Sequence, residues 1–215
     1  MLNIILTIIL AATIAGKTAL ISPVAPVKTL AAHEFSLEKR YGNTYVNDVF
    51  KDNILLTLDY LAGQKIEPTK VDWKNVEKPD TYKVTLKPGQ TFAFHDDLLP
   101  KYDGKVAVTT NAEFNSTQGF KSDGYLVGDG VCHLASLLYW TAKDAGLDAY
   151  APVRHDFAPV PEVPREFGVS IYATPGASYA SQQQNLYITN NKSKDVSFVF
   201  AYDGQNLKIS AEESI

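Results

Sequence analysis

The stretch GDGVCHLASLLYW, residues 128–140, contains the single cysteine of the chain, Cys132, where glycines give way to a helical pattern. A cysteine in the first turn of a helix lies beside unpaired backbone N–H groups and the positive end of the helix dipole, which both stabilise a thiolate. Asp129 is the expected N-cap residue. The N–H groups of residues 131–133 are also placed to bind the oxyanion that forms when a thiolate attacks a carbonyl. This stretch therefore predicts nucleophilic acyl transfer.

Thiol chemistry of this kind also needs an imidazole within hydrogen-bond reach. A helix over residues 132–146 advances about 20 Å, and a strand over residues 147–155 returns about 25 Å if it runs antiparallel to the helix. Because these lengths nearly cancel, His155 is expected beside the cysteine. His133 is adjacent in sequence, but its Cβ lies about 100° round the helix. His155 is therefore the better candidate for the base.

A structural role for Cys132 is the alternative. Free cysteine is among the most commonly buried residue types, and a buried cysteine is usually inert. The carboxylate of Asp129 also opposes a thiolate unless its charge is used in capping the helix. The residue types and their spacing leave both interpretations open.

The elements that must position these residues indicate an α+β fold, with mostly antiparallel strands in hairpins packed on a buried helix that starts at the cysteine. An amphipathic helix is expected over residues 45–63 and a helix that is apolar nearly all round over 131–145. Residues 111–130, with four glycines, read as a long loop. Strands are expected at 81–87 and 91–94 joined by the turn PGQ, at 105–110, 148–153, 167–173 and 185–190, and at 195–202 and 207–210 joined by DGQ.

The chain is expected to be organised in four parts. Residues 1–21 contain an uncharged apolar run that is typical of a signal peptide or signal anchor, which predicts an extracytoplasmic protein held at the membrane or secreted. A buried N-terminal helix is the alternative. Residues 22–44 are expected as a linker, 45–80 as a helical segment and 81–215 as the α+β domain.

Charge and motif content argue against several function classes. The chain has 20 Lys and Arg residues against 24 Asp and Glu residues, so a nucleic-acid partner is not expected. His95, Asp96 and Asp97 offer metal-ligand types, but adjacent side chains diverge and no second His or Cys pair has metal-binding spacing. The glycines of GYLVGDG lack the order of a phosphate-binding loop. Neither a metal nor a cofactor is therefore expected.

Several separated motifs resemble the VanW family. GDGVCHLASLLYWTAKDAGL (128–147) followed by RHDFAPV (154–160) is similar to the family's cysteine-containing helix and downstream histidine. LKPGQTFAF (86–94) is similar to its PGE hairpin, and NLYITN (185–190) to its KFxN strand. The motifs occur in the family's order and cover about residues 81–210.

The resemblance implies a domain of bacterial cell envelopes, some members of which act as L,D-transpeptidases on peptidoglycan through the cysteine. By position, the family's cysteine is Cys132 and its histidine is His155. The thiol would then attack the carbonyl that joins the third and fourth residues of a stem peptide, release D-alanine and form a thioester. A neighbouring stem's amine resolves this thioester in a transpeptidase, and water resolves it in a carboxypeptidase.

Three positions depart from the family's pattern. His133 stands where the family has glutamine, Asp156 where it has serine, and Gly168 at an acidic position that would orient the imidazole. Candidates for that orienting role are Asp156, Glu162 and Asn185, beside the capping candidate Asp129.

Substrate contacts are expected from residues near the cysteine. Arg154 and Lys121 are the nearest cations for a substrate carboxylate, and His133 and Tyr125 are further candidate contacts. The alternative function is a non-catalytic envelope module that binds peptidoglycan or a protein partner through residues 111–130.

Overall fold

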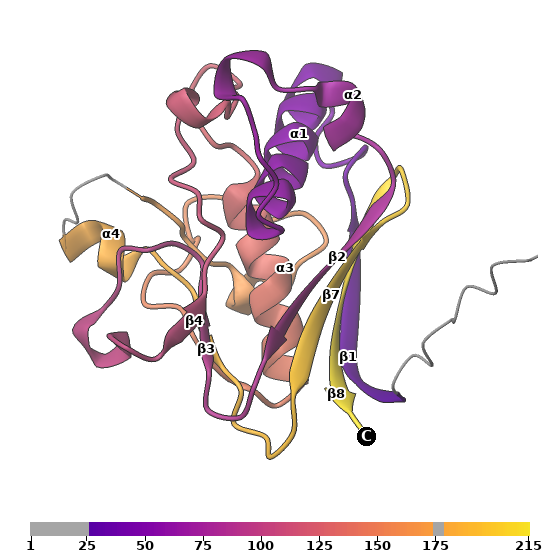
Figure 1. Ribbon diagram of the computed structural model, residues 1–215. Coiled ribbons are helices and arrows are strands. Elements are labelled where there is room, and N and C mark those ends of the chain that lie inside the picture. Colours follow the sequence, from indigo (N-terminus) through magenta and orange to yellow (C-terminus); the bar gives the residue numbers. More distant parts are fainter. Residues whose placement is uncertain (1–25, 174–178) are drawn as a thin grey trace, which may run out of the picture.

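Two small β-sheets and a pair of longer helices make up the fold (Figure 1). The computed structural model describes residues 26–173 and 179–215, so the expected signal peptide or anchor lies outside the described residues. The α+β class is confirmed. The helices are α1 (Thr44–Leu61), α2 (Trp73–Val76), α3 (Val131–Asp144) and α4 (Tyr179–Gln183), and 3-10 turns span Pro68–Lys70, Pro100–Tyr102, Ser116–Gln118 and Arg165–Phe167.

The first sheet is antiparallel, with the strand order β1-β8-β7-β2. Strands β7 and β8 form a hairpin in which Tyr202 pairs with Leu207 across the DGQ turn, as the sequence predicts. Its strands are β1 (Val27–Ser36), β2 (Asp80–Leu86), β7 (Val196–Tyr202) and β8 (Asn206–Ser214).

The second sheet is mixed and has the order β4-β3-β6-β5. Strands β3 and β4 are parallel, whereas β3 with β6 and β5 with β6 are antiparallel. Its short strands are β3 (Thr91–Ala93), β4 (Val106–Val108), β5 (Asp148–Tyr150) and β6 (Tyr187–Thr189).

The expected linker over residues 22–44 is wrong where the structure describes it. Residues Val27–Ser36 form the edge strand β1, which pairs with β8 along its length. Only Phe35 is fully buried within this strand, because an edge strand is held largely by backbone hydrogen bonds. The strand therefore lacks the clear alternation that would have predicted it.

The expected hairpin across the PGQ turn is also wrong, since β2 and β3 belong to different sheets. The buried side chain of Asn190 donates to the carbonyl of Leu86 at 2.8 Å, and the N–H of Gly89 donates to the carbonyl of Asn190 at 2.8 Å. The turn at residues 87–90 is thus held against the connection between β6 and β7. The connection from β2 to β3 and the connection from β6 to β7 therefore lie next to each other where they pass between the two sheets.

Residues 167–173 do not form the predicted strand. The N–H groups of Val169 and Ile171 donate to Ser136 Oγ (2.9 Å) and Cys132 Sγ (3.3 Å) on α3. Those of Ser170 and Tyr172 donate to backbone carbonyls on the other side. The alternating pattern of residues 167–173 therefore belongs to an extended segment whose N–H groups are hydrogen-bonded to helix α3 and not to a neighbouring strand on that side.

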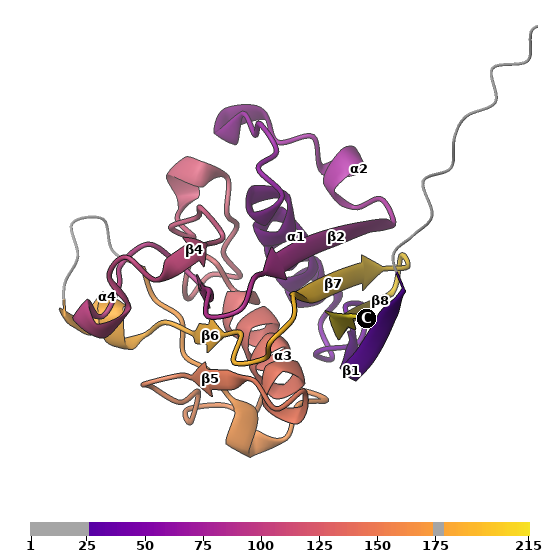
Figure 2. The ribbon, with the colours of Figure 1, turned by 60° about the horizontal axis from the view of Figure 1, so that its bottom comes forward.

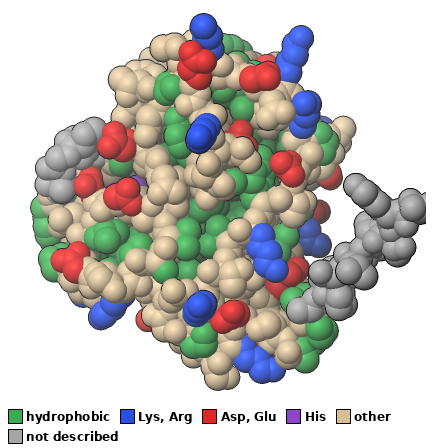
Figure 3. Space-filling view, in the orientation of Figure 1, with side chains coloured by type: hydrophobic (Ala, Val, Ile, Leu, Met, Phe, Trp, Pro, Cys, Tyr) green, Lys and Arg blue, Asp and Glu red, His purple; other side chains and the backbone are tan. Residues whose placement is uncertain are grey.

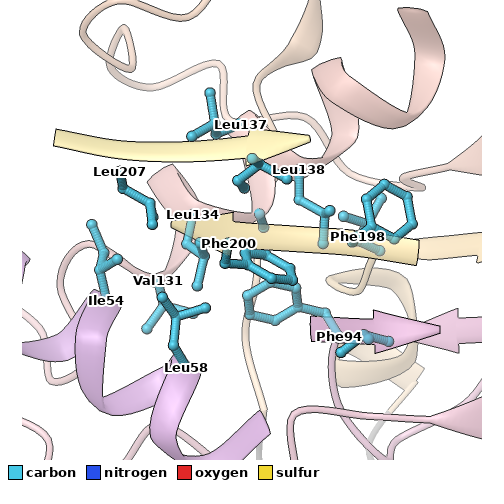
Figure 4. Close-up of a cluster of buried hydrophobic side chains, with 14 of the residues drawn as sticks. Ile54, Leu58, Phe94, Val131, Leu134, Leu137, Leu138, Phe198, Phe200 and Leu207 are labelled. Carbon is cyan, nitrogen blue, oxygen red and sulfur yellow. The ribbon is translucent and has the colours of Figure 1, made fainter. Parts of the chain in front are cut away.

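Helix α3 lies between the two sheets, as the second view shows (Figure 2). Its apolar side chains meet those of α1, β7 and β8 in one hydrophobic core (Figure 4). The central residues of this core are Ile54, Leu58, Phe94, Val131, Leu134, Leu137, Leu138, Phe198, Phe200 and Leu207. Because α1 shares this core, the helix expected at residues 45–63 packs directly against the domain that follows it.

Helix α1 also buries polar side chains, and one of them holds the long loop before α3. Asn53 is fully buried, and its Nδ2 donates to the carbonyls of Lys121 (3.0 Å) and Asp129 (2.9 Å). Its Oδ1 accepts from the N–H of Lys121 at 2.8 Å. One side chain therefore satisfies three backbone groups and fixes the loop from residue 121 to the start of α3.

On the face shown in Figure 3, basic and acidic side chains are interspersed, with no broad basic region. Across residues 26–173 and 179–215, no helix has the length and apolar character needed to cross a membrane.

We expect Asn53→Ala to lower the free energy of unfolding by about 2–4 kcal/mol, because it leaves three buried backbone groups without partners. Urea denaturation followed by circular dichroism measures this change. The control is Asn191→Ala, which removes one exposed hydrogen bond to the carbonyl of Gly146. Equal effects of the two substitutions would contradict the role given to Asn53.

Candidate functional site

The start of α3 sets the position of Cys132. Gly130 is the N-cap residue with a φ of 97°, so Cys132 is the second residue of the helix, and its predicted place in the first turn is confirmed. A Cβ on Gly130 would lie 2.7 Å from the carbonyl oxygen of Phe50. Only glycine combines this φ with such a close approach of α1. The start of α3 and the middle of α1 are therefore in backbone contact.

The expected capping role of Asp129 is wrong. Gly130 takes the N-cap position without a side-chain hydrogen bond, and Asp129 Oδ2 accepts instead from the N–H of Asp123 at 3.0 Å. Burial is the main reason that the pKa of Asp129 rises to about 6. Its carboxylate thus closes the preceding loop and is not used on the helix end.

The thiol of Cys132 is half-buried and faces the backbone of Ile171. Sγ accepts from the Ile171 N–H at 3.3 Å and lies 3.6 Å from the Ile171 carbonyl oxygen. Loss of hydration raises the thiol pKa to about 11, and the charge of Asp129 raises it further. The expected stabilisation of a thiolate at the helix end is therefore wrong for the free protein, because burial outweighs the helix dipole.

A cavity of about 340 Å³ lies at this end of α3 and contains both Cys132 and His155 in its walls. Residues from α1, from the loop before α3 and from two later segments meet there. The lining residues are Tyr41, Phe50, Glu113, Phe114, Asn115, Leu126, Val127, Gly128, Asp129, Gly130, Val131, Cys132, His133, His155, Phe157, Ala158, Ile171, Tyr172 and Ala173. The chain thus brings the predicted nucleophile and base to the same cavity.

His155 returns to the cavity by a different path from the one expected. Strand β5 ends at Tyr150, and the chain continues as an extended segment in which the His155 N–H donates to the carbonyl of Gly168 at 3.2 Å. A Cβ on Gly168 would lie 3.3 Å from the Cβ of His155. The residue that replaces the family's acidic position therefore packs directly against the histidine backbone.

A backbone carbonyl orients the imidazole of His155. Nδ1 lies 2.9 Å from the carbonyl oxygen of Ala158, which can only accept, so Nδ1 carries the proton. Burial lowers the pKa of His155, so the ring is neutral near pH 7. Its Nε2 consequently has a free lone pair and is able to act as a base.

The side chains expected to orient this imidazole have other partners. Asp156 Oδ1 lies 3.5 Å from Arg154 Nε. Glu162 accepts from the N–H of Ser36 at 2.9 Å, and Asn185 accepts from the N–H of Phe94 at 2.9 Å. None of these three side chains therefore orients the imidazole of His155, and the carbonyl of Ala158 does so instead.

The expected oxyanion donors are reduced to one. The N–H of Val131 donates to the carbonyl of Gly128 at 3.1 Å, and that of His133 to the carbonyl of Gly130 at 3.0 Å. Of the three amides, only that of Cys132 has no carbonyl partner within the described residues. Oxyanion stabilisation at this helix end therefore rests on one backbone N–H, together with any side-chain donor in the cavity.

The two predicted substrate cations lie outside the cavity lining. Lys121 pairs with the buried carboxylate of Asp52 and lies 3.8 Å from the ring centroid of Trp73. Arg154 is exposed and pairs with Asp156. Tyr125 is 92% exposed and also lies outside the lining, whereas His133 is part of it.

Arg40, which the sequence did not single out, reaches the site from before α1 together with its neighbour Tyr41. Arg40 Nε donates to His133 Nδ1 at 2.9 Å, and the side chain of Tyr41 lines the cavity. The only local signal is Asn43, whose side chain caps α1 by accepting from the N–H of Tyr45. That signal places the helix start, but it does not reveal a contact with a residue 93 positions later.

Comparison with known proteins gives a family and nothing beyond it. A family model described as VanW like protein matches residues 79–211. No curated protein and no solved structure matches the chain.

We expect alkylation of Cys132 by iodoacetamide in the ligand-free protein to be slow at pH 7, with only about 1 in 10⁴ thiols ionised. Its rate should rise about tenfold per pH unit up to pH 10 without a plateau, because the thiol pKa is about 11. Asp129→Asn should speed alkylation at a given pH by removing a charge that raises this pKa. Glu113→Gln, in the same cavity, is the control. An inflection below about 8.5 would contradict this account.

Proposed function

The chain belongs to the VanW family, and on that premise we propose that it is a cysteine-dependent L,D-transpeptidase that cross-links peptidoglycan stem peptides. The observation that carries this proposal is the cavity that Cys132 and His155 share, with the His155 Nε2 lone pair left free by the Ala158 carbonyl. A nucleophile and a neutral base in one accessible cavity are the minimum that acyl transfer requires.

In the proposed first step, Sγ of Cys132 adds to the carbonyl carbon between the third and fourth stem residues while Nε2 of His155 takes the thiol proton. The bond from that carbon to the D-alanine nitrogen then breaks, and His155 returns the proton to the leaving amine. The products of this step are a thioester on Cys132 and free D-alanine. The Cys132 N–H donates to the oxyanion between the two events.

In the second step, the amine of a neighbouring stem adds to the thioester carbonyl and loses a proton to His155. The carbon–sulfur bond breaks, and the sulfur recovers the proton as a thiol. The new amide is the cross-link. Attack by water in place of the amine would yield a shortened stem, which is the carboxypeptidase outcome.

The raised thiol pKa makes His155 essential in this mechanism. A thiol with a pKa of about 11 is not ionised before the substrate arrives, so proton removal must accompany attack. The lowered pKa of His155 keeps the imidazole unprotonated and ready for that transfer. We therefore infer general-base catalysis and not a preformed thiolate–imidazolium pair.

We further propose an extracytoplasmic location, with residues 1–21 acting as a signal peptide or membrane anchor. The uncharged apolar run at residues 2–16 supports this proposal. Peptidoglycan stem peptides are the partner that this location makes available.

We expect incubation with muropeptides to add one acyl group to Cys132 with the loss of D-alanine, seen by intact-mass and peptide mass spectrometry. Cys132→Ala should abolish the adduct. His155→Gln should slow its formation by about 10²–10⁴-fold, because Gln offers no base. Arg154→Gln, outside the cavity, is the matched control. Adducts that form equally fast without His155 would contradict the mechanism, and released products separate cross-linking from hydrolysis.

A non-catalytic envelope module is the second candidate function. It is favoured by the Sγ contacts with Ile171, which give Cys132 a structural part in holding the segment after His155. Exposed Leu126 in the loop before α3 would then contribute to a peptidoglycan or protein contact. In that case Cys132→Ala keeps full binding to isolated peptidoglycan sacculi, and no adduct forms in the wild type.

A further inference from the structure

Arg40 lies directly behind the cavity wall, although it precedes the region that the family model covers. Only 4% of the residue is exposed. Its Nη1 and Nη2 donate to the carbonyls of Ser36 and Pro161, each at 2.9 Å, and its Nε donates to Nδ1 of His133 at 2.9 Å. Glu162 lies 3.8 Å away and compensates the buried charge. The guanidinium is therefore fixed on three sides, with one N–H directed at an imidazole.

This contact determines the protonation of His133. A guanidinium has donors only, so Nδ1 of His133 must be an unprotonated acceptor. The ring is then neutral, with its proton on Nε2. Burial, followed by the charge of Arg40, lowers the pKa of His133 well below its usual value, in agreement with this state.

The Nε2 proton of His133 faces the hydroxyl of Tyr41, 3.4 Å away, so that oxygen accepts. The backbone of Tyr41 is held in both directions by Asn47 of α1, whose Oδ1 accepts from the Tyr41 N–H (2.8 Å) and whose Nδ2 donates to the Tyr41 carbonyl (3.0 Å). Within the described residues, no protein group accepts the hydroxyl proton of Tyr41. This proton is therefore available in the cavity that Tyr41 lines.

We propose that Arg40 is a positioning residue that fixes His133 as the Nε2-protonated imidazole, so that the hydroxyl of Tyr41 donates its own proton to an uncharged carbonyl oxygen of the bound ligand. Tyr41 is thereby a specificity-determining residue for an amide or ester group. That the ligand contacted by Tyr41 is a stem peptide rests on the proposed function.

The charge of the cavity supports an uncharged acceptor. Among the described residues, its lining contains the acidic residues Glu113 and Asp129 but neither lysine nor arginine. His133 and His155 are neutral because their pKa values are lowered. A ligand carboxylate at this place would meet two negative groups, while the guanidinium of Arg40 lies behind His133 and is paired with Glu162. A carbonyl needs only a neutral donor. Burial raises the pKa of Tyr41, which keeps the hydroxyl protonated as that donor.

The first test does not depend on any ligand. Nitrogen-15 NMR of histidine-labelled protein at pH 7 should show His133 with unprotonated Nδ1 and protonated Nε2. In Arg40→Met the fixed tautomer should be lost, while Tyr41→Phe should keep it. A proton on Nδ1 of His133 in the wild type would overturn the proposal.

The second test measures affinity by calorimetry for a stem tetrapeptide with a C-terminal carboxamide, in the Cys132→Ala background so that no acyl transfer occurs. Tyr41→Phe should weaken binding about tenfold, as expected for one lost hydrogen bond to a buried carbonyl. Tyr45→Phe is the matched control, because the exposed Tyr45 hydroxyl donates to the Ser122 carbonyl outside this cavity. It should bind as the background does.

Variants of His133 test whether it connects Arg40 to the hydroxyl of Tyr41. Glutamine also presents an acceptor, its amide oxygen, and a donor, its NH2 group, so His133→Gln should stay within about threefold of the background. His133→Met should lose about as much affinity as Tyr41→Phe, and the double substitution should lose no more than either alone. If the affinity losses of His133→Met and Tyr41→Phe were additive, the proposed link between His133 and Tyr41 would be overturned. Unchanged affinity in Tyr41→Phe would overturn the role of the Tyr41 hydroxyl.

The two tests separate this proposal from the enzymatic one. Weaker binding by Tyr41→Phe without any Cys132 adduct in the wild type supports the Tyr41 site and rejects the transpeptidase. Failure of the tetrapeptide to bind at all overturns the ligand assignment, whatever the NMR result. A preference of tenfold or more for the free C-terminal carboxylate would overturn the uncharged acceptor.

Discussion

The site depends on the contact between the middle of α1 and the start of α3. At Gly130 the two backbones approach more closely than any side chain would permit, and a few residues along α1 the amide of Asn53 takes up the carbonyl of Asp129. These two contacts determine where α3 begins and therefore where Cys132 lies. Neither contact involves a catalytic group, yet both hold chain segments that line the cavity.

Burial governs the chemistry of this cavity. It raises the pKa of Cys132 and lowers those of His133 and His155, so all three groups are uncharged in the free protein. The two imidazoles are then distinguished by their neighbours and not by charge. The Ala158 carbonyl places the proton of His155 on Nδ1, and the guanidinium of Arg40 places that of His133 on Nε2. Two rings with centroids 6.0 Å apart thus face the cavity with opposite hydrogen-bonding character.

Sequence patterns predict the parts of this arrangement that are local. The apolar periodicity of α3, its C-terminal glycine at residue 146 and the hairpin of β7 and β8 all follow from contacts between near neighbours in the chain. The return of His155 to the start of α3 was predicted from chain lengths, although the strand assumed for that prediction ends at Tyr150. Strand β1 was not predicted because it buries little. The turn between β2 and β3 is held by Asn190, which is 104 positions away from Leu86 in the sequence.

The electrostatics of the site were the least predictable part. A helix N-terminus favours a thiolate, but the sequence does not show how much water the surrounding segments remove. The orienting group of His155 is a backbone carbonyl, which leaves no mark on residue type. Arginine is a residue type that is usually exposed, so the sequence does not indicate that Arg40 is buried beside His133.

The fold extends beyond the region that the family model covers, because strand β1 pairs with β8. The family model begins at residue 79, whereas β1 covers the outer edge of β8 and the chain after it carries Arg40 and Tyr41. A protein trimmed to the family boundary would present the unpaired N–H and carbonyl groups of β8 to solvent, a surface that recruits strands from other molecules. Such a fragment would be prone to self-association, and one side of its cavity would be missing.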